Sequence, residues 1–342
     1  MKRLIALFLL LLNLTGCAFH PTAPGTETTG GDTLAVHYID VGQADCALLE
    51  CGGQFMLIDG GNVDDSSLVV SYLEQQGVEE LALVVCSHAH EDHVGGLPGV
   101  LAVYPTKAVW APTRTYSSGC FDDFVYYTDQ QGLQITIPTA GDRFSLGGAQ
   151  ITVLGPVEKY AETNNTSLIL MVQFGDNRFL FTGDMETEAE NDMLDAGANV
   201  KADVLKVGHH GSNTSTGYRF LYEVDPEYAV ISVGEDNSYG HPHEEPMSRL
   251  RDADVTIYRT DEMGTVIALS DGKNIRFSWQ MGSAKPEDPT LSAPEYYIGN
   301  VNSHALHLPS CSSLPSEKNQ IRFDDLEQAL AAGYTPCSRC MK

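Results

Sequence analysis

The stretch Ser87-His88-Ala89-His90-Glu91-Asp92-His93-Val94-Gly95-Gly96 places three imidazoles and two carboxylates within six consecutive residues. It follows the apolar run 81–86, which predicts a buried strand, and it precedes an apolar segment that can begin a helix at Val94. In an extended segment His88 and His90 point the same way, and the following turn can direct Asp92 and His93 toward a second ion. The pattern therefore predicts a metal-binding turn at the end of a rigid strand.

This HxHxDH pattern resembles the signature of the metallo-β-lactamase superfamily, and other segments are similar to further motifs of that family. Residues 38–45 and 57–61 are similar to its opening strands, 182–184 to its bridging-aspartate motif, and 207–212 to a later histidine motif. The resemblance covers residues 34–280 and is closest to the hydrolase domain associated with ComEC-like competence proteins. It implies an α/β fold, the αββα sandwich of two mixed sheets with helices outside.

The resemblance also implies a role for each site residue. It implies that two divalent metal ions, Zn or Mn, share the ligands His88, His90, Asp92, His93, Asp184 and His210. Catalytic contacts are expected from Asp92, His209 and His241, with His241 near the leaving group. Asp59 is expected to orient the ligand turn by hydrogen bonding without binding metal. Adjacent histidines cannot share one orientation, so the reverse assignment of His209 and His210 stays open.

The segment 163–167 departs from the family pattern. Many members place a histidine ligand just before the bridging aspartate, whereas this chain has Asn165 or a neighbouring residue there and no histidine. We expect Asn165 to support the metal ligands, as Asp59 does, without binding metal itself. The departure weakens one of the two metal positions.

The remaining patterns predict alternating strands and helices, which is typical of a layered α/β fold. Strands are expected at 34–41, 46–51, 55–58, 108–111, 150–154, 168–174, 178–181, 202–207 and 228–233, and helices at 66–75 and 121–128. Three last strands, 255–258, 265–269 and 274–278, are expected to close the second sheet. Cys46 and Cys51 could form a disulfide, with buried free thiols as the alternative.

The composition is that of a soluble globular protein with a strong negative charge. The chain has 342 residues, 42% of them hydrophobic, and 46 acidic against 20 basic residues give a formal charge of -26. This charge opposes broad electrostatic attraction to nucleic acid or to an anionic membrane surface. A polyanionic substrate must then be held by metal ions or by a local basic patch.

The first residues indicate export. Met1-Lys2-Arg3 precedes the apolar run 4–12, which is too short to span a bilayer as a helix. Leu14-Thr15-Gly16-Cys17 resembles the bacterial lipobox, with a plain signal peptide as the alternative. Residues 1–17 would be a lipoprotein signal peptide and 18–33 a flexible tether. The resemblance implies an exported protein anchored by lipid on Cys17 to the outer face of a bacterial membrane, with no other membrane contact.

The last residues predict a separate zinc module. Residues 281–294 have the composition of a linker, and the module spans 295–342. His307, Cys311, Cys337 and Cys340 have a spacing suited to one tetrahedral structural zinc. The segment resembles the zinc-binding domain of the Ada repair protein, except that His307 stands where that family has a first cysteine. Methyl transfer to a thiolate is therefore not supported.

The leading hypothesis is a metal-dependent hydrolase that acts through a metal-bound hydroxide. A phosphodiesterase or nuclease acting on extracellular nucleic acid or phosphodiesters is expected. The alternatives are hydrolysis of another ester, namely a phosphocholine ester, a lactam or a thioester, and a non-enzymatic surface module that binds DNA for uptake.

Overall fold

The computed structural model describes residues 33–280, 296–307, 314–323, 328–329 and 332–336. The predicted signal peptide with Cys17, the tether up to Asp32 and the linker lie outside these residues, and so do Cys311, Cys337 and Cys340. Within the described ranges, no helix combines the length and the apolar character that crossing a membrane requires.

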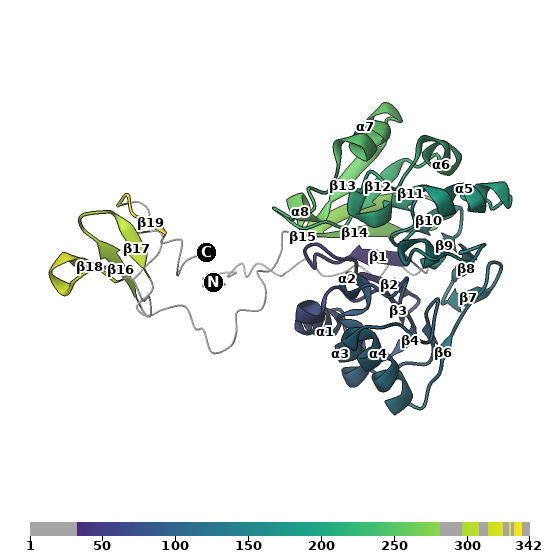
Figure 1. Cartoon of the computed structure of the whole chain (residues 1–342), viewed down its shortest axis with the longest axis horizontal. Helices are drawn as coiled ribbons and strands as arrows, with labels where there is room; N and C mark the ends of the chain where they lie inside the picture. The colour runs from purple at the N-terminus through teal and green to yellow at the C-terminus, as the bar shows by residue number, and fades with distance from the viewer. Residues whose placement is uncertain (1–32, 281–295, 308–313, 324–327, 330–331, 337–342) are drawn as a thin grey trace, which may run out of the picture.

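Two mixed sheets form the centre of the main domain (Figure 1). The first has the order β15 (Ile275–Gln280), β14 (Thr265–Ser270), β1 (Leu34–Tyr38), β2 (Ala47–Cys51), β3 (Gln54–Ile58), β4 (Leu81–Val85), β5 (Val109–Trp110) and β6 (Ile135–Thr136). The second has the order β13 (Thr256–Arg259), β12 (Tyr228–Ile231), β11 (Val204–Lys206), β10 (Asn177–Phe181), β9 (Ile169–Phe174), β8 (Ala149–Gly155) and β7 (Arg143–Leu146).

Helices cover the outer face of each sheet, so the main domain has four layers (Figure 1). The first sheet is followed outward by α1 (Ser66–Gln75), α2 (Glu91–Val94), α3 (Leu97–Val103) and α4 (Gly119–Gln130). The second carries α5 (Thr187–Asp195), α6 (Tyr218–Val224), α7 (Glu244–Asp252) and the short α8 (Thr260–Met263). Short 3-10 turns lie at η1 (Val63–Asp65), η2 (Asn164–Thr166) and η3 (Gly208–Gly211). The predicted αββα sandwich is confirmed.

The burial of the strands explains their sequence patterns. All residues of β4 are buried, with Leu83 and Val85 facing the core between the sheets and Leu81 and Val84 facing the helices. A strand covered on both faces is apolar throughout, which is why 81–86 shows no alternation. In β8 buried and half-buried residues alternate, because only one of its faces packs in the central core.

The last strands correct one prediction about the sheets. β13 joins the second sheet, but β14 and β15 belong to the first, where β14 pairs antiparallel with β1 from Leu34↔Ser270 to Tyr38↔Val266. Residues 265–280 therefore close the first sheet beside the chain's opening strand. Helices α5 and α7 form in segments for which the sequence pattern predicts no element. Cys46 is a buried free thiol, so it forms no disulfide with Cys51.

The described part of the C-terminal module contains a small sheet. Its order is β18 (Gln320–Phe323), β16 (Tyr297–Asn300), β17 (Ala305–His307) and β19 (Thr335–Pro336), with the turn η4 (Glu317–Asn319) before β18. Among its described residues, Leu306, Phe323, Ala329 and Tyr334 form a small apolar cluster, and His307 is buried at the end of β17. So small a core is typical of a module that a metal ion helps to stabilise.

Candidate metal centre

The turn with the clustered histidines follows β4 directly, and Asp92 and His93 lie in helix α2 rather than in an open turn. Glycine backbones hold this turn against the loop after β3, since the Gly60 nitrogen donates to the His93 carbonyl at 2.7 Å. A Cβ atom on Gly96 would lie 2.0 Å from the Gly60 oxygen. Only glycine permits this approach, so the ligand turn is rigidly placed.

Asp59, at the end of β3, orients the turn by two hydrogen bonds. Its Oδ1 accepts from the Ser87 backbone nitrogen at 2.6 Å, and its Oδ2 lies 2.8 Å from His93 Nδ1. A carboxylate only accepts, so His93 donates from Nδ1 and leaves Nε2 free. His93 Nε2 lies 3.2 Å from Asp184 Oδ1. Asp59 therefore fixes which nitrogen of His93 faces the centre of the site.

Asp92, His93, Asp184 and His210 form one compact group, in which one donor atom of each lies within 4.8 Å of all the others. His210 Nε2 is 3.3 Å from Asp92 Oδ2 and 3.8 Å from Asp184 Oδ1. These residues come from both sheets: α2 follows β4, whereas Asp184 follows β10 and His210 follows β11. Nitrogen and carboxylate donors converging in this way suit a divalent ion such as Zn or Mn.

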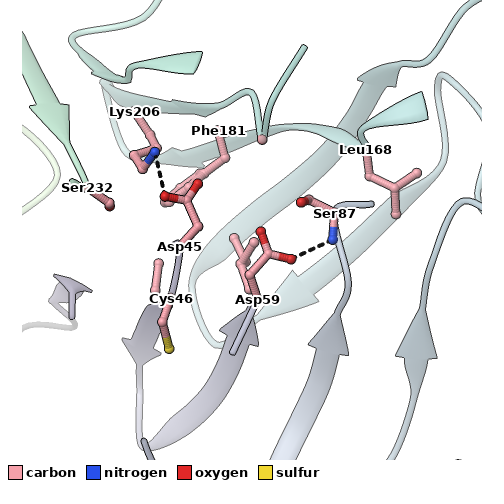
Figure 2. A pocket seen from close by; sticks show the side chains of 11 residues that line it. Asp45, Cys46, Asp59, Ser87, Leu168, Phe181, Lys206 and Ser232 are labelled. Carbon is pink, nitrogen blue, oxygen red and sulfur yellow. Dashed lines mark hydrogen bonds and ion pairs between the residues drawn. The ribbon is translucent and has the colours of Figure 1, made fainter. Parts of the chain in front are cut away.

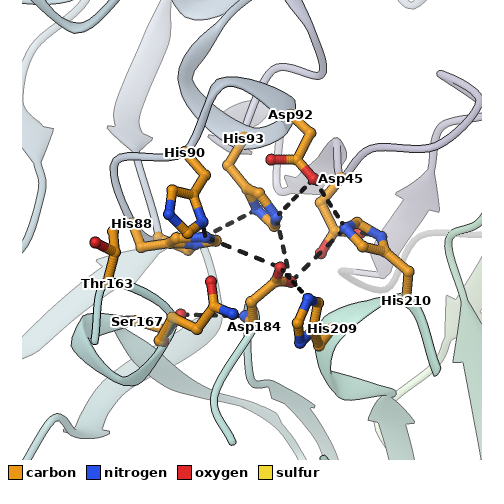
Figure 3. A network of polar contacts seen from close by, with 12 residues as sticks. Asp45, His88, His90, Asp92, His93, Thr163, Ser167, Asp184, His209 and His210 are labelled. Atoms are coloured by element: carbon orange, nitrogen blue, oxygen red, sulfur yellow. Dashed lines mark hydrogen bonds and ion pairs between the residues drawn. The ribbon is translucent and has the colours of Figure 1, made fainter. Parts of the chain in front are cut away.

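The second oxygen of Asp184 faces a different set of imidazoles (Figure 3). Asp184 Oδ2 lies 3.9 Å from His88 Nε2 and 3.7 Å from His209 Nε2. His88 Nε2 is in turn 3.1 Å from His90 Nδ1, a separation at which two nitrogens can bind one ion. Asp184 therefore presents one oxygen to each of two adjacent groups of donors.

Charge is concentrated around Asp184. Burial alone would raise the pKa of this carboxyl, but the charges of His93 and then His210 hold the pKa well below its usual range. Burial would lower the pKa of His210, yet the carboxylates of Asp184 and then Asp45 raise it to about 10. Burial, followed by His93, lowers the pKa of His88. Protons on His93 and His210 thus neutralise the carboxylates in the protein without metal.

Two buried atoms at the centre have no hydrogen-bond partner among the described residues, namely His93 Nε2 and Asp184 Oδ1. Polar groups that are buried in native proteins nearly always have a partner. The shared position of these two atoms, between Asp92 and His210, therefore fits a bound cation.

Behind the group lies a buried ion pair that the sequence motifs did not indicate (Figure 2). Lys206 Nζ is 2.9 Å from Asp45 Oδ1, with side-chain exposures of 5% and 7%. Asp45 Oδ1 is also 3.4 Å from His210 Nδ1, which lies 3.0 Å from the Ser232 carbonyl. Burial would raise the pKa of Asp45, but Lys206 and then His210 lower it. A charge within the apolar run of β11 was the signal for this pair in the sequence.

The group opens into a cavity of about 360 Å³. The lining residues are Gln43, His90, Glu91, Asp92, Asn164, Asp184, His209, His210, Tyr239 and His241. Among these residues none is lysine or arginine. Burial, followed by the charge of His210, lowers the pKa of His241 to about 4, and Tyr239 at the rim is 67% exposed and stacks on His241.

The turn before β9, which has no histidine, gives its two asparagines different surroundings. Asn165 accepts from the Glu186 backbone nitrogen at 2.9 Å and donates to Glu188 at 3.2 Å, so it supports the turn after Asp184. Asn164 lines the cavity instead. The structure thus brings all the predicted site residues of the main domain to one place, and adds Gln43, Asn164 and Tyr239 to them.

Comparisons with known proteins agree with this geometry. The family model "Metallo-beta-lactamase superfamily" matches residues 39–235, and the model "Metal binding domain of Ada" matches residues 284–342. The C-terminal match covers the predicted zinc ligands His307, Cys311, Cys337 and Cys340.

The chain is similar to competence proteins over about two thirds of its length. ComE operon protein 3 of Bacillus subtilis (strain 168) is 31% identical over 250 residues, which are 68% of this chain and 32% of that protein. Competence protein ComA of Neisseria gonorrhoeae is 33% identical over 243 residues, which are 70% of this chain and 33% of that protein. The chain therefore spans about a third of the length of these relatives.

Among solved structures, the metallo-beta-lactamase fold protein YhfI from Bacillus subtilis covers 72% of this chain and 100% of its own, with a TM-score of 0.47 and 12% identity. The family match extends over more than half of the chain, from β2 across both sheets to the loop after β12. With its αββα sandwich, its candidate metal site and these matches, the chain belongs to the metallo-beta-lactamase superfamily of metal-dependent hydrolases.

Proposed function

We propose that the chain is a phosphodiesterase or nuclease that uses two divalent ions, Zn or Mn, in its main domain. The observation that carries the proposal is Asp184, whose two oxygens face two separate groups of donors at the floor of an open cavity. One group is Asp92, His93 and His210, and the other is His88 and His90. Two bound ions would supply a nucleophile from water at neutral pH and neutralise charge developing on a phosphoryl oxygen.

The protein's own residues would prepare this site. Asp59 holds the proton of His93 on Nδ1, and Asp45 with the Ser232 carbonyl holds that of His210 on Nδ1, so both rings turn Nε2 toward the centre. Such contacts fix the tautomer and orientation of a ligating imidazole and raise its basicity. Because the carboxylates of Asp45 and Asp59 are almost fully buried, solvent does not compete for these contacts.

Gln43 would position His241 for contact with the substrate. Its Oε1 accepts from the Gly234 nitrogen at 3.1 Å, so its amide nitrogen faces His241 Nδ1 at 3.4 Å. Nδ1 is then the acceptor, and the ring proton is on Nε2. A neutral His241 can donate this hydrogen to an oxygen of the phosphoryl or leaving group, in agreement with the expected role near the leaving group.

Two features of the cavity support a phosphodiester that carries a base. The exposed ring of Tyr239 offers a nucleobase a stacking surface beside His241. Because no lysine or arginine is among the lining residues, the ions would supply the positive charge that binds the phosphate. A single phosphodiester suits this site better than a long polyanion, which needs a basic groove. Hydrolysis of another ester or DNA binding without turnover remain the alternatives.

The proposal also includes the location of the protein and the metal of its C-terminal module. We propose lipid attachment at Cys17 on the outer face of a bacterial membrane, where the substrate would be extracellular nucleic acid or another phosphodiester. We also propose one structural zinc bound by His307, Cys311, Cys337 and Cys340. The burial of His307 beside the small apolar core supports that assignment. A closed tetrahedral shell leaves this ion no position for water, so it would do no chemistry.

The test is Asp184→Ala with Asp176→Ala as its matched control. Asp176 is exposed in the turn at the far end of β10, so the control removes a carboxylate from the same hairpin. Hydrolysis of bis(p-nitrophenyl) phosphate and of single-stranded DNA is measured with Mn or Zn, and bound metal is counted. We expect Asp184→Ala to lose activity and metal, and the control to keep both. Undiminished hydrolysis by Asp184→Ala would refute the bridging assignment, and DNA binding without any turnover by the parent would favour the non-enzymatic alternative.

A further inference from the structure

Asn164 lies in the turn before β9, the segment that departs from the family pattern because it has no histidine. The turn η2, just before β9, is tied to the metal centre because Ser167 Oγ accepts from the Asp184 nitrogen at 3.1 Å and donates to the Asn164 carbonyl at 2.6 Å. The backbone nitrogen of Leu168 donates to the Ser87 carbonyl at 2.9 Å, and Figure 3 shows Ser167 next to Asp184, so the turn passes beside the residue that precedes His88. Asn164 lines the cavity from this turn.

The hydrogen bonds of Asn164 determine which end of its amide faces the cavity. Asn164 Nδ2 donates to Glu186 Oε1 at 3.3 Å, and Thr214 Oγ1 donates to the same oxygen at 3.0 Å. A carboxylate only accepts, so the amide nitrogen must face Glu186 and the amide oxygen must face away. Asn164 is 7% exposed, and its Oδ1 has no partner among the described residues. A buried acceptor of this kind points to a ligand atom or ion at that position.

We infer that Asn164 Oδ1 completes the metal position of His88 Nε2, His90 Nδ1 and Asp184 Oδ2, and that it lowers the preference of this position for Zn over Mn, compared with a histidine ligand. The inference rests on the proposed metal-dependent function and adds the metal preference of one position. Replacing an imidazole by an amide oxygen changes the donors from mainly nitrogen to an equal mixture of nitrogen and oxygen. Carbonyl and carboxylate oxygens suit Mn, whereas imidazoles also suit Zn well.

The test compares three variants of the full chain by titration with MnCl2, with bound Mn followed by electron paramagnetic resonance and Zn added as competitor. Thiolates select Zn, so the Mn signal reports the main domain. Asn164→Ala should weaken one of two Mn sites by at least about tenfold and leave the other unchanged. Asn164→His should keep both sites and raise the Zn-over-Mn preference of one of them. Asn165→Ala is the comparison for support of the turn: Asn165 holds the same turn without lining the cavity, so its loss should weaken Mn binding less than Asn164→Ala does.

The outcomes separate this inference from the proposed function. Two Mn sites of parental affinity in Asn164→Ala would overturn the inference. An equal loss of Mn affinity in Asn165→Ala would also overturn it, because it would indicate that the asparagines support the turn rather than bind the ion. A parent chain that binds no divalent ion in its main domain would instead refute the proposed function. If Asn164→Ala does not fold, the Mn and Zn preference of Asn164→His decides, and an unchanged preference would overturn the inference.

Discussion

Lys206→Met tests the buried ion pair behind the metal centre. The substitution keeps most of the aliphatic side chain and removes the charge that lies 2.9 Å from Asp45 Oδ1. It also removes the hydrogen bond from Nζ to the Val207 carbonyl at 3.1 Å. Asp45 then keeps only His210, at 3.4 Å, as a charged partner.

The expected cost follows from the burial of both partners. Breaking a buried pair leaves an uncompensated charge and costs about 3–5 kcal/mol. Because His210 still faces Asp45, we expect the lower end, a loss of about 3 kcal/mol in the free energy of unfolding. Asp45→Asn should cost a similar amount. The double variant removes both charges of the pair, so its loss should be about that of one single variant, which means a coupling energy of about 3 kcal/mol.

The measurement is denaturant unfolding of the metal-free full chain at pH 7, so that differences in metal affinity do not enter. Fluorescence can report the main domain, because Trp110 is buried in β5 and Trp279 is half exposed at the end of β15. Lys201→Met is the matched control: Lys201 pairs with Asp225 at 2.8 Å, but both side chains are more than 60% exposed. Such a pair is worth about 0–1 kcal/mol. A Lys206→Met loss as small as that of the control, or additive losses in the double variant, would refute the reasoning.

Four further predictions concern metal binding, substrate and modification. Without metal, His93 and His210 have raised pKa values, so the binding of ions at pH 7 should release one proton from each histidine. Metal affinity should therefore rise with pH up to about 10, the pKa of His210. Calorimetry in buffers of different ionisation enthalpy measures the proton release, and its absence would contradict the prediction. Tyr239→Ala should lower kcat/KM for thymidine 5′-(p-nitrophenyl phosphate) by a factor that corresponds to the loss of about 1–3 kcal/mol of base stacking. The kcat/KM for methyl p-nitrophenyl phosphate, which has no base, should stay unchanged. Cys337→Ser should unfold the C-terminal module, which measurements of zinc content and circular dichroism would detect. Turnover of a small phosphodiester should stay within about twofold of the parent. Cys17→Ser should abolish acylation and membrane partition, and mass spectrometry finding the same lipidated peptide in parent and variant would contradict this.

The sequence predicted the parts of the fold that depend on local patterns. The run 81–86 and the helix 66–75 have clear periodicity and clear ends, and they form as β4 and α1. The partner of β14 could not be predicted, because alternation shows which face is buried and not which strand lies beside it. Helix α7 was missed because its sequence is strongly polar, with only Pro246 and Leu250 buried.

The candidate site shows the same division. His88 to His93 were recognisable because several strong ligands are adjacent in sequence. Asp45 and Gln43 were read only as part of an opening strand, since their partners, Lys206 and His241, are more than 150 residues away. The choice between Asn164 and Asn165 depends on how the turn is rotated, which Glu186 determines through its hydrogen bonds.

The cavity without lysine or arginine also has a kinetic consequence. A chain with a formal charge of -26 and an acidic cleft repels a polyanion during diffusional approach, so metal must bind before substrate. Added salt should therefore accelerate the association of long oligonucleotides, which is opposite to the behaviour of proteins with basic grooves. The screening length falls from about 30 Å at 0.01 M to about 8 Å at 0.15 M ionic strength, so the gain should be complete near physiological salt. Dinucleotides, which carry little charge, should bind at nearly the same rate throughout.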